Sequence, residues 1–125
     1  IVANDHPLAS LERFPLAKLG DYPYIKMIYE HHTAVPGIFE KFHCTPQVAY
    51  EMDNDAAAMA MISKGFGFSI IPELYAKCIP LDLRYLEFDP PQKRTVSIGT
   101  RSMSTASKAC VKFIEYTRKW VAENT

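Results

Sequence analysis

Two glycines separated by one residue, Gly65 and Gly67, could begin a phosphate-binding loop; they open the stretch GFGFSIIPEL at 65–74. A phosphate-binding glycine motif follows a strand and opens a helix, so that the anion meets the N–H groups of the helix N-terminus. Here a helix-like run precedes the glycines and an apolar strand-like run follows them. The order instead predicts that Gly65 ends a helix with a positive φ angle and that Gly67 allows another backbone segment to approach closely.

The adjacent histidines His31 and His32 are the next candidates for chemistry. Neighbouring residues on a strand or loop point in different directions, so a metal site here would need additional ligands. His43 and Cys44 follow about one helix later and are expected at the opposite end of that helix. We therefore expect no metal site, and we interpret the pair as a solvent-exposed or ligand-facing loop.

Nucleophilic catalysis is not indicated by the cysteines Cys44, Cys78 and Cys110. Cys110 lies on the apolar stripe of a helix, and Cys44 and Cys78 end helices, where the helix dipole disfavours a thiolate. The sequence has no G-x-S-x-G element, and the carboxylates Asp53 and Asp55 adjoin a helix start that needs a cap. We expect no catalytic residue, no cofactor and no enzymatic activity.

Composition places the chain among globular proteins of one domain: it has 125 residues, is 48% hydrophobic, and carries 14 basic and 14 acidic residues. Zero formal charge disfavours direct binding of nucleic acid by these residues. No apolar run approaches the roughly 20 residues that span a bilayer. Unpaired, scattered cysteines fit a reducing cytosol. The first residue is Ile1 rather than Met, so we expect the chain to be part of something longer.

Alternating strand-like and helix-like segments predict a small, largely parallel α/β sheet. Strands are expected at 24–29, 47–53, 66–71, 83–88 and 95–101. Helices are expected at 34–43, 56–64, 72–77 and over the C-terminal amphipathic run. In the second strand, alternation points Val48, Tyr50 and Met52 inward. The expected helix N-caps are Thr33, then Asp53 or Asn54, and finally Ser104 or Thr105.

Ligands of parallel α/β sheets bind outside the carboxyl ends of the strands, near the following helix N-termini. This rule selects three places in the sequence: the polar loop 30–33, the turn 53–55 and the segment 71–73. They are the candidate site on topology alone.

Several of these segments occur together in a known family. HPLA at 6–9, L-x-x-L-x-D-Y-P-Y-I at 16–25, the block EMDNDAAAMAMISKGFGFSIIPEL at 51–74, and RTVSIGTR at 94–101 before an amphipathic helix appear in that order. Over nearly its whole length the chain resembles the effector-binding domain of LysR-type transcriptional regulators. The resemblance implies an α/β fold, a Rossmann-like lobe of a type 2 periplasmic-binding-protein-like domain with a mostly parallel sheet flanked by helices.

The resemblance also implies an arrangement of domains and partners. Residues 14–93 would form the second lobe of the effector domain, and 1–13 and 94–125 would belong to an incomplete first lobe. The winged helix-turn-helix that binds DNA would lie outside this chain. Such a regulator is cytoplasmic, has no membrane partner, binds a small-molecule effector between its lobes and forms a homo-oligomer, either a dimer or a tetramer.

Effector contacts of the family come from the loop after the first strand of this lobe, from the end of its second strand, and from near its third strand. The family commonly has small or hydroxyl residues in the first loop, so two histidines there suggest an anionic or aromatic effector. The residues carried over by this resemblance are His31, His32, Thr33, Met52, Asp53, Asn54 and Phe68.

Two other classes of protein remain open at this point. A solute-binding protein of a transport system has the same lobe design; it would require a secretory signal upstream, and three free cysteines argue against it. A small α/β enzyme would require a pocket that holds an activated nucleophile.

Overall fold

The structure is a computed structural model that describes residues 1–76, 78 and 80–124, without the side chains of His31 and His32. The chain divides into two compact units, residues 1–94 and residues 95–125.

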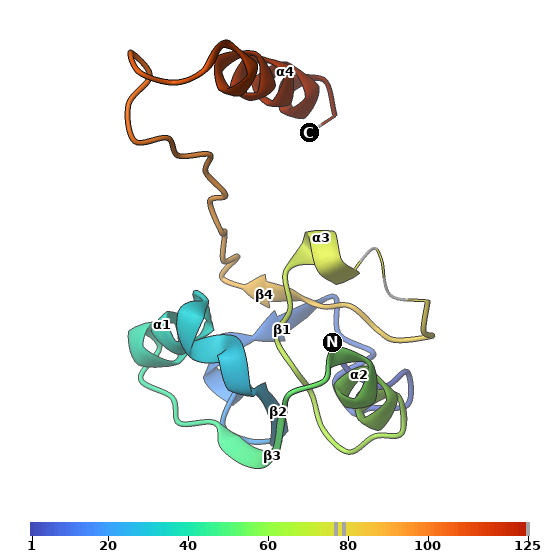
Figure 1. Cartoon of the computed structure of the whole chain (residues 1–125). Helices are drawn as coiled ribbons and strands as arrows, with labels where there is room; N and C mark the ends of the chain where they lie inside the picture. The colour runs from blue at the N-terminus through green and yellow to red at the C-terminus, as the bar shows by residue number, and fades with distance from the viewer. Residues whose placement is uncertain (77, 79, 125) are drawn as a thin grey trace. The chain divides into compact units, whose positions relative to one another are not determined.

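The strands of the first unit pair in parallel (Figure 1). Phe14 pairs with Phe88 between β1 and β4, and Tyr24 pairs with Val48 between β2 and β3. A further parallel bridge joins Tyr24 to Phe68. The predicted α/β class with a largely parallel sheet is confirmed. The strands are β1 Arg13–Pro15, β2 Pro23–Met27, β3 Gln47–Met52 and β4 Glu87–Asp89.

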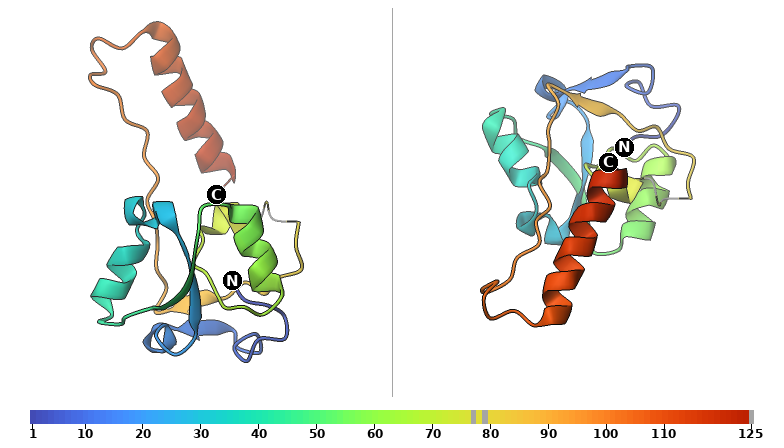
Figure 2. Two further views of the ribbon diagram at one scale, coloured as in Figure 1. Left: turned by 60° about the horizontal axis from the view of Figure 1, so that its bottom comes forward. Right: turned by 90° about the horizontal axis from the view of Figure 1, so that it is seen from above.

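Helices α1 and α2 lie on opposite sides of the β2–β3 pair (Figure 2). Successive side chains of a strand point to opposite faces, so β2 contributes to two cores. Tyr24 packs in one core with residues of α1, whereas Ile25 and Met27 pack in the other with residues of α2. The helices of this unit are η1 Leu16–Lys18, η2 Ile28–His32, α1 Val35–Lys41, α2 Asp55–Ser63 and α3 Glu73–Ala76.

The glycine pair has the structural roles predicted for it. Gly65 follows α2 with φ +78°, and its N–H donates to the carbonyl of Ile62 at 2.9 Å. The N–H of Phe66 donates to the carbonyl of Met61 at 3.2 Å, which completes a Schellman cap. Gly67 has φ +151°, and a Cβ built there would lie 2.4 Å from the carbonyl oxygen of Pro23. Close approach of a neighbouring backbone is therefore confirmed.

Predicted strands are shortened where a partner strand is missing. The run 66–71 keeps only the bridge at Phe68, and 83–88 yields a regular strand only from Glu87. Residues 95–101 form no strand, which corrects the prediction. Val96 is 74% exposed, and a strand is stable only when another strand takes up its hydrogen bonds. The short helix expected at 72–77 is found as α3, and residue 77 lies outside the described residues.

Two predictions of exposure were wrong. The segment expected as a polar loop at 30–33 begins within η2, and Glu30 is buried because its carboxylate finds a partner inside the protein. Val48 and Tyr50, predicted to point inward, are 43% and 39% exposed. Among the described strands, β3 pairs only with β2 and is therefore an edge strand.

The second unit contains α4, Lys108–Asn124. Its cap is Ser107, whose Oγ accepts the N–H of Cys110 at 3.2 Å, rather than the predicted Ser104 or Thr105. The aromatic residues Phe113, Tyr116 and Trp120 recur at helical spacing and are more than half exposed. We call these three residues the α4 aromatic stripe. No helix in the described part of the chain is long and apolar enough to cross a membrane.

Candidate functional site

Three polar side chains meet where three parallel segments end. Tyr29 lies in η2 after β2, Asp55 is the first residue of α2 after β3, and Tyr75 lies in α3 after the segment that contains Phe68. The Tyr29 hydroxyl donates a hydrogen bond to Oδ1 of Asp55, and the Tyr75 hydroxyl interacts with the same carboxylate. We call these three residues the tyrosine–aspartate cluster. Asp55 belongs to the turn 53–55 selected by the strand-end rule, whereas Tyr29 and Tyr75 lie just outside the selected segments 30–33 and 71–73.

The tyrosine–aspartate cluster holds its phenols in the protonated form. Partial burial and the neighbouring Asp55 carboxylate raise the pKa of Tyr29 to about 12, and burial followed by Asp55 raises the pKa of Tyr75. Both tyrosines remain about 40% exposed, at 42% and 38%. Two aromatic faces and one hydrogen-bonded carboxylate are therefore accessible at this edge of the sheet.

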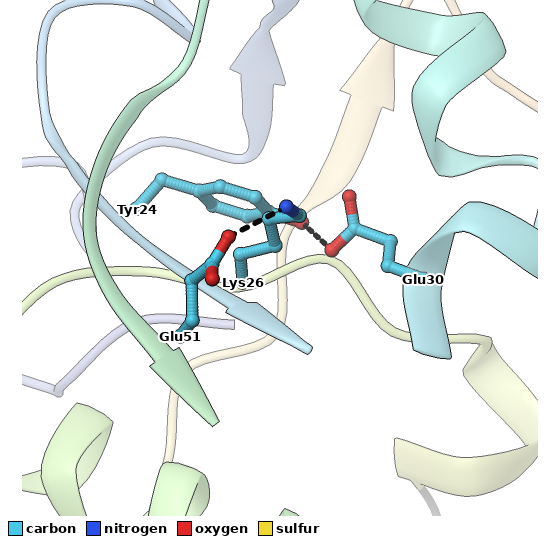
Figure 3. A network of polar contacts seen from close by, with 4 residues as sticks. All are labelled: Tyr24, Lys26, Glu30 and Glu51. Carbon is cyan, nitrogen blue, oxygen red and sulfur yellow. Dashed lines mark hydrogen bonds and ion pairs between the residues drawn. The ribbon is translucent and has the colours of Figure 1, made fainter. Parts of the chain in front are cut away.

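A second set of polar contacts involves residues of β2, η2 and β3 (Figure 3). The hydroxyl of Tyr24 donates to Oε2 of Glu30, and Nζ of Lys26 donates to Oε1 of Glu51 at 2.7 Å. Burial raises the pKa of Glu30, while the Tyr24 hydroxyl and the Lys26 charge act in the opposite direction. Burial and the Glu30 carboxylate also raise the pKa of Tyr24 far above its usual range, so the phenol remains a donor.

An open groove of about 270 Å³ lies beside this network. Its buried members include Tyr24, Glu30 and Phe39, and its other members are more exposed. The groove therefore presents a carboxyl–phenol pair among mainly apolar walls. The residues that line it are Tyr24, Lys26, Glu30, Pro36, Phe39, Pro46 and Val48.

Thr33 makes two hydrogen bonds at the end of the first predicted contact loop, residues 30–33. Its hydroxyl donates to the carbonyl of Glu30 at 2.7 Å and accepts the N–H of Val35, the first residue of α1, at 3.2 Å. The N-cap position itself is Ala34, whose side chain makes no capping bond, so the cap predicted at Thr33 lies one residue too early. The backbones of His31 and His32 close η2. Their side chains lie outside the described residues, as does the prediction that they contact a ligand.

At the end of β3, Asp53 and Asn54 are exposed, and Met52 is partly buried against the core on the α2 side. Of the two predicted N-caps, Asp53 and Asn54, the cap is Asn54: its Oδ1 accepts the N–H of Ala57 at 2.9 Å. Phe68 is only 2% exposed, and its ring contacts those of Phe14 and Tyr24 in the core.

The sequence does not indicate Tyr29, Asp55 and Tyr75 as a group. Tyr29 falls in the predicted strand 24–29 and Tyr75 in the predicted short helix 72–77, whereas Asp55 belongs to the turn 53–55 that is a predicted site. The available signal was position, because each residue follows closely after a predicted strand end. Position in the sequence does not show that both tyrosine hydroxyls interact with the carboxylate of Asp55.

The chemistry available at this edge is hydrogen bonding and aromatic contact. Within the described residues, no group of three His, Cys, Asp or Glu side chains could hold a metal ion. Burial raises the pKa of the Cys44 thiol, which disfavours the nucleophilic thiolate.

Comparison with known proteins identifies the fold. Residues 1–122 match the family model of the LysR substrate binding domain. The chain belongs to this LysR family. The resemblance predicted from HPLA, the glycine block and RTVSIGTR is therefore confirmed. The α/β architecture with parallel strands is that of a LysR effector-binding domain, the type 2 periplasmic-binding-protein-like class.

Relatives of this LysR domain are longer proteins. The chain is 28% identical over 121 residues to the uncharacterized HTH-type transcriptional regulator YvbU of Bacillus subtilis (strain 168), covering 95% of this chain and 41% of that protein. It is 35% identical over 75 residues to the HTH-type regulator YybE of the same organism, covering 58% and 26%. The chain thus spans less than half the length of the curated relatives it matches.

A solved relative shows the same LysR fold with a ligand. It is the effector binding domain of QuiR in complex with shikimate, which matches with a TM-score of 0.52 and 26% identity. The match covers 58% of this chain and 35% of that one.

Proposed function

We propose that this chain is the regulatory part of a LysR-family transcriptional regulator that senses a small metabolite. The observation that carries the proposal is the family match over residues 1–122. Two relatives named as transcriptional regulators support it. The proposed protein is cytoplasmic, catalyses no reaction and needs no cofactor.

The effector site that we propose is the edge where β2 and β3 end. The tyrosine–aspartate cluster supports this location, since it supplies accessible aromatic and polar groups at the edge where parallel α/β sheets bind ligands. QuiR, a relative with the same fold, binds shikimate, which supports a small polar metabolite as the effector class. The cluster adds to the contacts predicted from sequence: His31, His32, Thr33, Met52, Asp53, Asn54 and Phe68.

We further propose that the chain is one part of a two-lobed domain. Residues 14–93 form its second lobe, and 1–13 and 94–125 are the segments that belong to the first lobe. Large exposed apolar groups usually mark a surface that packs against another, and the α4 aromatic stripe fits the remainder of the first lobe. DNA is bound by a winged helix-turn-helix outside these residues, in a homo-oligomer that is a dimer or a tetramer.

The coding sequence upstream of Ile1 distinguishes this proposal from the solute-binding alternative. A regulator has a winged helix-turn-helix there, whereas a transport protein has a secretory signal. An upstream sequence that encodes no winged helix-turn-helix contradicts the regulator.

Binding by the full-length protein tests the effector site. Titration calorimetry with shikimate, benzoate and L-lysine samples a polyol carboxylate, an aromatic carboxylate and a cationic amine. For the probe that binds, His31→Ala or His32→Ala should weaken affinity about 3- to 10-fold, the value of one or two ordinary hydrogen bonds. The matched control is His43→Ala, after α1, which should leave affinity unchanged. The predicted contacts are contradicted if all three variants bind the probe as tightly as the wild-type protein does.

A further inference from the structure

We propose that Glu30 is a positioning residue that holds the His31–His32 turn in place for the effector. Glu30 lies in the middle of η2, immediately before the two histidines, and is 5% exposed. The inference rests on the proposed function, because that function makes the turn an effector contact. Two sets of hydrogen bonds carry the argument, one through the side chain of Glu30 and one through its carbonyl.

The side chain of Glu30 accepts a hydrogen bond from a tyrosine whose ring is closely packed in the core. Tyr24 on β2 donates its hydroxyl to Oε2 of Glu30, and the two side chains point toward each other in Figure 3. Tyr24 is fully buried, and its ring centroid lies 5.3 Å from that of Phe39 and 5.1 Å from that of Phe68. Close packing leaves this ring few alternative rotamers. The carboxylate of Glu30 is therefore fixed relative to the sheet.

The main chain of Glu30 closes the turn from the other side. Its carbonyl accepts the N–H of Thr33 at 2.8 Å and the Thr33 hydroxyl at 2.7 Å. The same hydroxyl accepts the N–H of Val35 at the start of α1. The backbone of the two histidines thus runs between one residue bonded to β2 and another bonded to α1.

A buried carboxylate is a poor choice if stability alone is required. Charged groups lose hydration on burial, and apolar residues of similar volume often stabilise a core as well or better. A carboxylate with a directional partner instead fixes one conformation of the segment that carries it. The charged group that faces Glu30 from β2 is Lys26, itself bonded to Glu51 of β3, so the negative charge is partly compensated.

Hydrogen exchange of the full-length protein tests this role. Glu30→Ala should accelerate exchange of amides 28–35 about 10- to 100-fold, as expected for the loss of a hydrogen bond to a charged group. Amides of β2 and α2 should keep their protection. Glu30→Gln should restore slow exchange, because its amide oxygen can accept the Tyr24 hydroxyl. The control Glu51→Gln removes the exposed pair with Lys26 and should behave as wild type.

Tyr24→Phe provides a second route if Glu30→Ala does not fold, since it removes the donor and keeps the ring; the same local acceleration is expected. Unchanged exchange at 28–35 in the folded variants, or acceleration spread over residues 1–94, overturns the inference. So does a probe among shikimate, benzoate and L-lysine that binds wild type and Glu30→Ala with equal affinity. Wild-type protein that binds none of the three argues against the proposed function instead, and exchange still decides whether Glu30 holds the turn.

Discussion

Replacing Gly67 with alanine would place a methyl group against the main chain of β2. The added Cβ would lie 2.4 Å from the carbonyl oxygen of Pro23 and 3.0 Å from its carbonyl carbon. These are backbone atoms, so the overlap cannot be relieved by turning a flexible side chain. Gly67 also has φ +151°, a conformation that residues with a Cβ rarely adopt.

The loss in free energy of unfolding can be worked out from the hydrogen bonds around that contact. The N–H of Phe68 donates to the carbonyl of Pro23 at 3.0 Å, and the N–H of Ile25 donates to the carbonyl of Phe68 at 2.9 Å. Moving the two segments apart weakens both bonds, each worth about 0.5–1.5 kcal/mol. Backbone strain adds on the order of 1–3 kcal/mol. These contributions sum to about 2–6 kcal/mol, so we expect Gly67→Ala to lower the free energy of unfolding by about 4 kcal/mol, a large share of the roughly 5–15 kcal/mol typical of a domain.

Two other glycines serve as matched controls in denaturant unfolding of the same protein. Gly65 has φ +78° but no atom within 4 Å of an added Cβ, so Gly65→Ala should cost only about 1–2 kcal/mol. Gly37 lies inside α1 with no atom within 4 Å, and Gly37→Ala should stabilise by about 0.5–1 kcal/mol. The reasoning is refuted if Gly67→Ala unfolds within about 1 kcal/mol of Gly65→Ala with an unchanged denaturant dependence.

Three further outcomes are expected. Asn54→Ala removes the bond from the Ala57 N–H and should cost about 1 kcal/mol in thermal or urea unfolding, whereas Asn54→Asp should cost little; equal losses would contradict the cap. Burial raises the pKa of Glu30, so its contribution to stability is fully present below the unfolded pKa and is lost as pH rises through the folded value. Glu30→Gln should therefore flatten the decline in urea-measured stability above about pH 4.5, and parallel pH profiles would argue against this. Ultraviolet titration should show Tyr29 ionising near pH 12, and Asp55→Asn should lower that value in part; no change would exclude the hydrogen bond.

The positions that require glycine and the residue that caps α2 could be predicted from the sequence. The glycine block was predicted correctly, since a helix end and a close backbone approach each require a residue without a side chain. The cap at Asn54 was predictable for a similar reason, as its bond partner is three residues away. The bond partner of Asn54 is close in the sequence, and the position of Gly67 has no room for a Cβ, so neither prediction required knowledge of a distant side chain.

Features that depend on distant partners were not readable. The sequence predicts Glu30 in a polar loop because a carboxylate normally favours water, and only the fold supplies the hydroxyl of Tyr24. The run 95–101 has the composition of a strand, but no strand pairs with it among the described residues. The tyrosine–aspartate cluster shows the same limit, because its members come from three segments and only the position of each was visible in advance.

The hydrogen bond between Tyr29 and Asp55 has a consequence for how selective this edge can be. At the proposed effector site, a ligand donor that takes the place of the Tyr29 hydroxyl on Oδ1 of Asp55 exchanges one hydrogen bond for another. Such an exchange leaves the number of hydrogen bonds nearly constant and contributes little net affinity. Discrimination between ligands would then depend on how well the shape of each ligand fits against the rings of Tyr29 and Tyr75. Changing a single ligand substituent that points at Asp55 would alter specificity little.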